Sequence, residues 1–283
     1  MHSDRPSATA SYVAMGRAMA HARGNVNGFS DPFALQLLPE EHRAAVERLL
    51  RRQWPRTRRE LGLRLVAQSA EWLMGPRTAE IDDGLRGLPP GHQLVILGAG
   101  LDARAYRMQE LAQSAAFEVD HPATQAMKKD RTAGWPPVTR ELHHVPVDFV
   151  RERIGDALER AGHRSDVPTA WVFEGVITYL SRDEVEASLD SIASRSAPGS
   201  RLLLTYNEPS RVRRLLGHVT RQTAEPPKVA FAPEEMRRLL QARGFVVTSD
   251  RDGRARALRW VREPSWPALH WFRFHHVAIA DTE

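Results

Sequence analysis

Short apolar segments alternate with helical ones from residue 93 onward, and this alternation restricts the fold more than any other feature of the chain. A short continuous apolar run, such as Leu94–Leu97, is typical of a strand that is covered on both faces. Strands separated by helices form βαβ units, which assemble into a parallel sheet. We therefore predict a doubly wound α/β fold with a mostly parallel sheet. The expected strands are Gln93–Leu97, Ala115–Val119, His143–Val147, Ala170–Phe173 and Arg201–Tyr206, followed by a C-terminal pair at Phe245–Ser249 and Phe272–Ala280. The expected helices between them include Asp102–Leu111 and Arg182–Ser194.

The first 90 residues have a helical pattern only. Glu40–Leu50 and Leu61–Leu73 each place apolar residues roughly on one helix face, which in the second segment are Leu65, Val66, Ala70 and Leu73. The breaker cluster Leu88-Pro89-Pro90-Gly91 ends this region. We predict a helical cap or lid over residues 1–90 and a sheet domain over residues 91–283, packed together as one compact unit.

The charge of the chain allows a nucleic-acid-binding function but does not favour it. The net charge is +5, and 37 of the 40 basic residues are arginine, since only three are lysine. The arginine-rich stretch between residues 43 and 59 lacks the alternating aromatic residues on which bases stack. The favoured interpretation of this stretch is a solvated helix face that is broken at Pro55. The nucleic-acid-binding protein stays as an alternative.

Composition also excludes several classes of protein. Without cysteine the chain has neither disulfides nor thiolate zinc sites. No run reaches the ~18 apolar residues of a membrane-spanning helix, and residues 1–6 lack the pattern of a secretory signal. We expect a cytoplasmic protein with no metal, no nucleic-acid partner and no membrane contact.

Glycine and acidic residues follow the predicted strands, at the sheet edge where open α/β folds bind ligands. Gly98-Ala99-Gly100 opens a G-x-G-x-x-A loop, which lets the backbone approach a ligand closely. Asp120 ends the second strand, where a carboxylate accepts hydrogen bonds from a ribose diol. Asp148 ends the third, where it would accept from an adenine amino group. Nicotinamide cofactors and S-adenosylmethionine both fit this arrangement.

Three segments of the chain resemble the signatures of a known family, and this resemblance favours one of the two cofactors over the other. They are Leu94–Arg107 with the glycine loop, Phe117–Pro122 with the sequence Glu-Val-Asp-His-Pro, and Val172–Leu180 with Phe-Glu-Gly and Tyr-Leu. Together they resemble the signatures of the leucine carboxyl methyltransferases and the related bacterial polyketide O-methyltransferases of the tetracenomycin type. The resemblance covers residues 92–182 firmly and residues 31–85 more loosely, at Asp31–Ala34 and Pro76–Thr78.

The resemblance implies a Rossmann-like methyltransferase sheet that binds S-adenosylmethionine. It assigns Gly98 and Gly100 to the methionine end of the cofactor, Asp120 to the ribose, Asp148 with Phe149 to adenine, Glu174 to the methionyl amino group and Arg77 to the carboxylate. Two positions depart from the family pattern. Ala79 replaces an arginine, and Phe173 replaces the tryptophan that precedes Glu174.

The reaction implied is O-methylation of a small acidic or phenolic acceptor, with a carboxylate of a polyketide-like secondary metabolite as the first choice. An ionised carboxylate needs no base, and Tyr12, Tyr179 or Tyr206 would position it. A phenol would benefit from a base. The histidines considered are His143, His144, His218, His270 and His275, and none is assigned this role.

An NAD(P)-dependent reductase is the second enzymatic alternative. It is disfavoured because the chain lacks the Tyr-x-x-x-Lys pair that such a reductase would use.

Overall fold

The computed structural model describes residues 8–51, 53–54, 57–149, 152–209, 227–270 and 272–283. Seven strands form one sheet in the order β3-β2-β1-β4-β5-β7-β6. Strands β1 to β5 are parallel, and β7 runs antiparallel to both of its neighbours. The strands are β1 (Gln93–Leu97), β2 (Ala115–Asp120), β3 (Glu141–Pro146), β4 (Thr169–Phe173), β5 (Arg201–Asn207), β6 (Phe245–Asp252) and β7 (His275–Thr282). The predicted α/β fold is confirmed.

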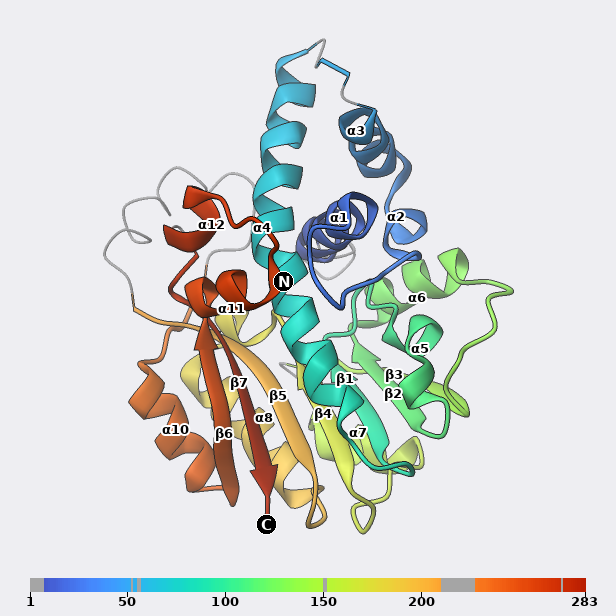
Figure 1. The fold of residues 1–283 in the computed structure, drawn as a ribbon. Helices are drawn as coiled ribbons and strands as arrows, with labels where there is room; N and C mark the ends of the chain where they lie inside the picture. Colours follow the sequence, from blue (N-terminus) through green and yellow to red (C-terminus); the bar gives the residue numbers. More distant parts are fainter. Residues whose placement is uncertain (1–7, 52, 55–56, 150–151, 210–226, 271) are drawn as a thin grey trace.

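The strand order reverses between β1 and β4, because the chain moves outward from β1 to β3 and then returns to the other side of β1. In open α/β sheets such a switch point is where ligands bind, beyond the carboxyl ends of the strands. The loops that follow β1, β2 and β4 therefore meet at one edge of the sheet. In Figure 1 this edge lies toward the N-terminal helices, and the C-terminus lies at the opposite edge.

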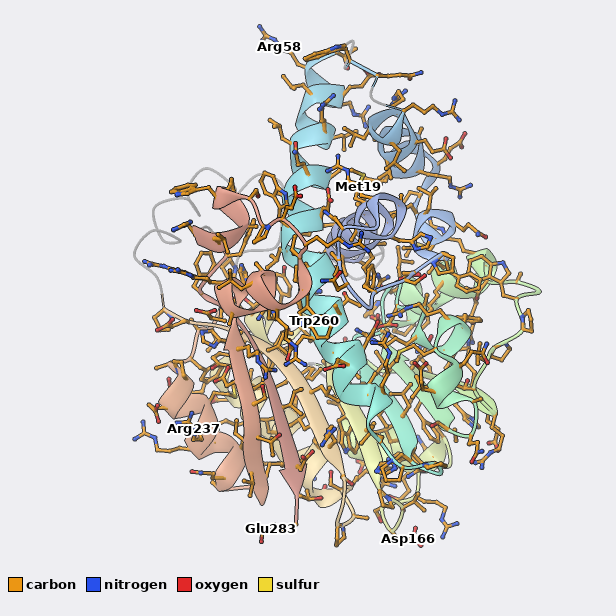
Figure 2. The ribbon with its side chains drawn as sticks, in the orientation of Figure 1. Met19, Arg58, Asp166, Arg237, Trp260 and Glu283 are labelled. Atoms are coloured by element: carbon orange, nitrogen blue, oxygen red, sulfur yellow. The ribbon has the colours of Figure 1, made fainter. Side chains whose placement is uncertain are left out.

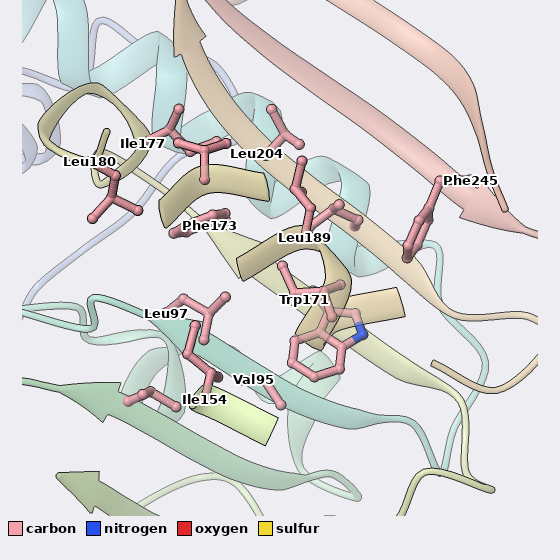
Figure 3. Packing of buried hydrophobic residues seen from close by; sticks show 14 of the residues in the cluster. Val95, Leu97, Ile154, Trp171, Phe173, Ile177, Leu180, Leu189, Leu204 and Phe245 are labelled. Carbon is pink, nitrogen blue, oxygen red and sulfur yellow. The ribbon is translucent and has the colours of Figure 1, made fainter. Parts of the chain in front are cut away.

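One face of the sheet is covered by α7 (Ile154–Arg160), α8 (Arg182–Ser194) and α10 (Pro233–Gln241). Because side chains alternate along a strand, Trp171 and Phe173 of β4 point to this face and are fully buried (Figure 3). Ala170 and Val172 point to the other face. Helix α8 begins with a capping box between Ser181 and Glu184, and it has the predicted bounds.

The opposite face is covered by α4 (Arg58–Arg86) and by α5 (Arg104–Arg107), whose apolar residues share a core cluster with β1 and β4. Helix α6 (Pro122–Arg131) lies on the same side, where Lys128 bonds Glu118 of β2. We predicted one helix from Asp102 to Leu111. The structure has α5 and a separate 3-10 turn, η1 (Gln109–Leu111), because the Asp102 carboxylate accepts from the Arg104 backbone N–H at 2.8 Å and starts the helix late.

Helix α4 is longer than the predicted Leu61–Leu73 segment. It begins after Thr57, whose side chain accepts from the Glu60 N–H, and it continues through Pro76 to Arg86. A proline normally weakens a helix interior because it removes one backbone hydrogen bond. Here nearly every residue from Leu73 to Leu85 is buried, and that burial offsets the loss. The predicted break at Pro55 lies outside the described residues.

The remaining N-terminal helices are α1 (Ala8–Arg23), α2 (Ala34–Leu37) and α3 (Glu40–Leu50), of which α3 has the predicted bounds. Helix α1 crosses α4 in close contact: a Cβ on Gly16 would lie 2.4 Å from the Ala70 carbonyl oxygen. On the other side of α4, α11 (Gly253–Trp260) and α12 (Trp266–His270) complete the layer. None of the described helices is both long and apolar enough to cross a bilayer.

The apolar residues of α4 differ in burial. Ala70 and Leu73 are buried, whereas Leu65 and Val66 are 60% and 41% exposed. The N-terminal part of α4 extends beyond the sheet (Figure 1), where α1 and α3 pack against α4 and leave these two side chains uncovered.

Candidate active site

The glycine loop after β1 approaches its neighbours too closely for a side chain. Gly98 has a φ of 68°, and a Cβ there would lie 2.3 Å from Cγ2 of Val176. Its backbone N–H donates to the Val119 carbonyl at 2.8 Å, which ties the loop to the end of β2. Gly100 has a φ of 48°, and a Cβ there would lie 3.2 Å from Cβ of Ala10, so α1 covers the loop.

Asp120 lies at the end of β2, against this loop. Its carboxylate accepts from the backbone N–H of Gly100 and from that of His121 at 2.6 Å. Burial raises the pKa of Asp120, and the two N–H groups partly oppose that rise. The Asp120 carbonyl accepts from Val147 N–H at 2.9 Å, so Asp148 follows directly at the same edge. The structure thus brings together Asp120, predicted to bind the ribose of a cofactor, and Asp148 with Phe149, predicted to bind its adenine.

Phe149 is partly buried and packs against the core cluster on the α7 face. This contact fixes the chain just after Asp148. Asp148 itself is half-buried.

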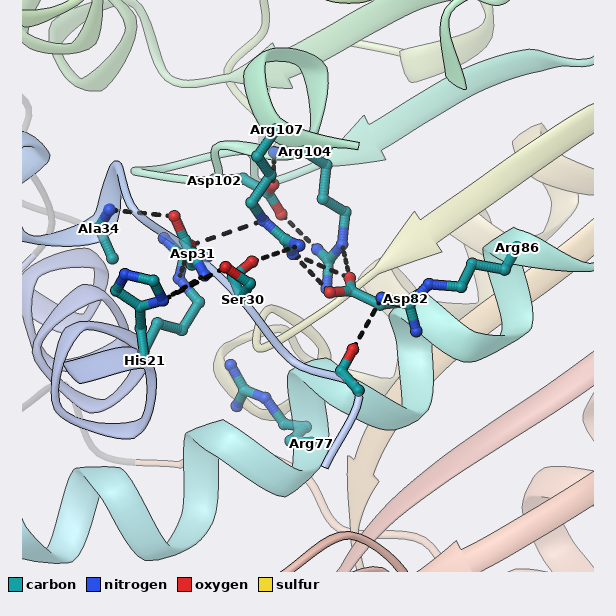
Figure 4. A network of polar contacts seen from close by, with 12 residues as sticks. His21, Ser30, Asp31, Ala34, Arg77, Asp82, Arg86, Asp102, Arg104 and Arg107 are labelled. Atoms are coloured by element: carbon teal, nitrogen blue, oxygen red, sulfur yellow. Dashed lines mark hydrogen bonds and ion pairs between the residues drawn. The ribbon is translucent and has the colours of Figure 1, made fainter. Parts of the chain in front are cut away.

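Glu174, at the end of β4, is held by two arginines. Nε of Arg77 donates to one carboxylate oxygen at 2.8 Å, and Nη1 of Arg104 donates to the other at 2.8 Å. Arg104 is completely buried and also bonds Asp102 and Asp82, the latter from Nε at 2.8 Å (Figure 4). Three carboxylates therefore surround one guanidinium beneath the glycine loop.

The network continues from Asp82 into the N-terminal helices. Arg107 donates to Asp82 at 2.9 Å and lies 3.7 Å from Asp31 (Figure 4). Arg17 of α1 lies 3.2 Å from Asp31 and also donates to the Leu101 carbonyl in the glycine loop. Because buried charges are stable only when paired, this chain of ion pairs fixes α1 and α4 to the sheet edge.

The arginines reverse the effect of burial on the acids. Burial alone would raise the pKa of Glu174, but Arg104 and Arg77 lower it to about 2. Burial likewise opposes ionisation of Asp102, and Arg104 and Arg17 hold its pKa well below the usual value. Both acids are thus carboxylates at neutral pH.

Arg77 has an unused donor at this site. Its Nη2 is buried and has no hydrogen-bond partner among the described residues. Gly175 lies beside it, with the place of a Cβ 3.7 Å from that nitrogen. An unpaired buried N–H is costly, so this nitrogen suits a ligand carboxylate. The positive-φ glycines, the Asp120 carboxylate and this nitrogen together fit S-adenosylmethionine.

We expect acid to weaken the fold through Glu174. Because its pKa is lowered from 4.5 to about 2, its stabilising contribution is complete above pH 4.5 and is lost as the pH falls through about 2. The free energy of unfolding should therefore fall less steeply over this range in Glu174→Gln than in the wild type. Denaturant unfolding at several pH values measures this. Glu234→Gln, at an exposed pair with Arg237, serves as control, and equal slopes for all three proteins would contradict the prediction.

The three candidate tyrosines lie in different places. Tyr12 of α1 has its hydroxyl 3.4 Å from Oγ of Ser69; burial raises the pKa of Tyr12, and the bond to Ser69 partly opposes that rise. Tyr179 ends the 3-10 turn η2 (Ile177–Tyr179), which follows Glu174 and Gly175 in the chain. Tyr206 is engaged differently: it is buried, stacks on His276 and donates its proton to Asp250.

The histidines considered as bases have other surroundings. Burial and the neighbouring Lys128 lower the pKa of His144 to about 4. His143 bonds Glu141 at 3.1 Å, His270 stacks on Trp266 and His275 contacts the rings of Phe272 and Phe274. His218 lies outside the described residues. In the described part of the chain no cluster of His, Asp and Glu forms a metal site.

Sequence reasoning missed most of the buried network. Its members without a predicted role are Arg17, Asp31, Asp82, Asp102, Arg104 and Arg107. Asp31, Asp102, Arg104 and Arg107 belong to the quoted signature segments, which was the only signal available. The structure also accounts for a departure from the family pattern: Ala79 packs in an apolar cluster with Phe29 and Trp260, where an arginine would not fit.

Comparisons with known sequences show the family of this chain. The family model described as leucine carboxyl methyltransferase matches residues 10–193. A protein of Frankia alni, provisionally named an S-adenosyl-L-methionine-dependent methyltransferase, is 35% identical over 238 residues, which cover 81% of this chain and 78% of that protein. A Mycobacterium tuberculosis protein with the same provisional name is 37% identical over 211 residues, 70% of this chain and 65% of that protein.

Two solved structures share the fold. A protein of Thermobifida fusca, provisionally described as a methyltransferase, superposes with a TM-score of 0.59 at 19% identity, covering 100% of this chain and 96% of that one. A glycopeptide N-methyltransferase solved with S-adenosyl-L-homocysteine superposes with a TM-score of 0.51 at 16% identity, covering 74% of this chain and 90% of that one.

Proposed function

This chain belongs to the leucine carboxyl methyltransferase family, and from that premise we propose that it methylates a carboxylate of a small, polyketide-like acid. It is an S-adenosylmethionine-dependent methyltransferase. The observation that carries the proposal is the convergence of Gly98, Asp120 and the unpaired Arg77 nitrogen at one sheet edge.

The residues divide between cofactor and acceptor. Gly98 and Gly100 would hold the methionine end of the cofactor and Asp120 the ribose, with Asp148 at the adenine and Arg77 at the carboxylate. Glu174 would attract the amino group, while its two arginines keep it ionised. S-adenosylmethionine supplies an electrophilic methyl group on a sulfonium.

The chain's own task is alignment and the exclusion of water. Helix α1 lies directly over the glycine loop and contributes to both. Tyr12 of α1, the helix over the glycine loop, and Tyr179, in the turn that follows β4, offer hydroxyl donors to an acceptor carboxylate. Such an acceptor is ionised at neutral pH and needs no base. This agrees with a site in which Glu174 is engaged by two arginines and is not available as a base.

We expect the product to be a methyl ester rather than an ether. The purified protein is incubated with S-adenosylmethionine labelled in its methyl group and with matched aromatic acids and phenols, and the product is then treated with mild alkali. An ester releases labelled methanol, whereas an ether keeps its label. An alkali-stable product made only from phenols would contradict the carboxylate proposal.

The variant Tyr12→Phe tests whether the Tyr12 hydroxyl binds the acceptor. It should raise the KM for the acid by roughly tenfold, since a hydrogen bond to a charged group contributes about 1.5–3 kcal/mol. Affinity for the cofactor should not change. Tyr106→Phe is the matched control: it too loses a hydroxyl that bonds a hydroxyl side chain, that of Thr132, but its ring packs against Trp135 in a core cluster.

A further inference from the structure

The projecting end of the N-terminal helices has an unusual surface. Four of the seven large hydrophobic side chains that are most exposed in the described part of the chain lie here: Trp54 at 84%, Leu65 at 60%, Leu61 at 46% and Val66 at 41%. Arg51 and Arg58 are exposed beside them. Arg58 marks the far end of the molecule in Figure 2. We call these six residues the tip patch.

The same segment carries the net charge of the whole protein. Residues 51–66 contain six arginines and one glutamate, a net charge of 6 − 1 = +5, and the complete chain is also +5. The rest of the chain is therefore electrically balanced. Within the segment, Arg64 lies over the Trp54 ring at 5.6 Å, so charge and apolar surface are interleaved.

We propose that the tip patch docks on an anionic lipid membrane. Helices that bind bilayer surfaces combine apolar side chains and tryptophan on one side with basic residues around them. Arginine side chains near the surface are attracted to anionic headgroups. The patch lies on a projection, so a flat bilayer reaches it without interference from the sheet domain (Figure 1).

Other occupants match the patch less well. A second copy of the chain would bring two segments of charge +5 together. Nucleic acid is bound by basic side chains and by aromatic rings on which its bases stack. The exposed leucines Leu61 and Leu65 would contribute nothing to such binding. A stable protein interface takes about 20–30 residues on each side, far more than the six of the tip patch.

The membrane contact is peripheral, because no described helix is able to span a bilayer. It revises our expectation from composition that the protein has no membrane contact. That expectation rested on the absence of a long apolar run and did not consider an exposed patch, whereas the structure exposes Leu65 and Val66.

The test is flotation of the full-length protein with vesicles of phosphatidylcholine alone and of phosphatidylcholine mixed with phosphatidylglycerol. We expect binding to the mixed vesicles only, weakened by added salt because it depends on exposed charges. The double variant Leu61→Ser/Leu65→Ser should lower the bound fraction at least about tenfold, since each leucine loses its apolar contribution.

A matched control comes from the same protein. Val246 and Leu258 are exposed by 46% and 59%, almost the same as Leu61 and Leu65, but they lie on β6 and α11. Val246→Ser/Leu258→Ser should float like the wild type. Thermal unfolding confirms that both double variants are folded.

Three results would overturn the proposal. They are no flotation of the wild type, equal flotation with neutral and anionic vesicles, and equal flotation of the tip variant and the wild type. The first would leave a protein as the partner of the tip patch. Because flotation is measured without acceptor or cofactor, its failure is distinct from failure of the proposed methyl transfer.

Discussion

Replacing Asp120 with alanine is expected to lower the affinity for S-adenosylmethionine at least about a hundredfold and to leave the protein folded. A hydrogen bond to a charged group contributes about 1.5–3 kcal/mol, and a ribose diol donates two of them. The carboxylate also receives the Gly100 N–H, so its removal releases the loop that holds the methionine end. Calorimetric titration with the cofactor measures the loss.

Two comparisons make this result specific. Asp166→Ala removes an exposed carboxylate that pairs only with Arg164 at the surface, and it should bind the cofactor like the wild type. Titration of the wild type with NADPH should show no binding. Unchanged cofactor affinity in Asp120→Ala would refute the ribose assignment, and binding of NADPH alone would restore the reductase alternative.

Replacing Arg104 with methionine should produce the largest loss of stability. The side chain is fully buried and bonds Asp82, Asp102 and Glu174. Removing one partner of a buried ion pair costs about 3–5 kcal/mol. Here Asp102 loses its side-chain partner, while Asp82 keeps only Arg107 and Glu174 keeps only Arg77. At about 2–4 °C per kcal/mol, the Tm should fall by roughly 10 °C or more. Thermal unfolding at neutral pH measures this change.

A second variant keeps this prediction testable even if Arg104→Met does not fold. In Arg104→Met/Asp102→Asn the carboxylate that is left unpaired is removed as well, so the double variant should be more stable than the single one. Arg164→Met, which breaks only a surface pair, should change stability by less than about 1 kcal/mol. A wild-type Tm for Arg104→Met would contradict the role of the network.

The sheet was largely predictable because its strands are short apolar runs. The expected segments Gln93–Leu97 and Ala170–Phe173 match β1 and β4 to within one residue. The C-terminal half of α4 was not predicted, because Gly75-Pro76 suggests a break when only local conformation is considered. Tertiary burial decides this case: Gly75 packs against Ala20 and Val26, and the helix continues.

The candidate site was predictable only in part. Gly98, Asp120 and Glu174 follow strands, and strand ends meet at a known edge, so their proximity follows from the fold class. Arg104 and Arg17 are two of 37 arginines in this chain. Nothing in their local sequence distinguishes a buried ion pair from a solvated side chain, because burial depends on contacts between residues far apart in the chain.

The buried ion pairs also determine which chimeras between this protein and its relatives are able to fold. Residue 90 looks like a natural junction for a chimera, since helices precede it and the sheet follows. Yet Arg17, Asp31 and Asp82 lie on one side of that junction, and Arg104 and Arg107 lie on the other. If the N-terminal helices are replaced by helices of another protein that lack Asp31 and Asp82, the buried side chains of Arg104 and Arg107 lose these partners. Swaps that preserve the whole set are therefore the ones that yield folded hybrids.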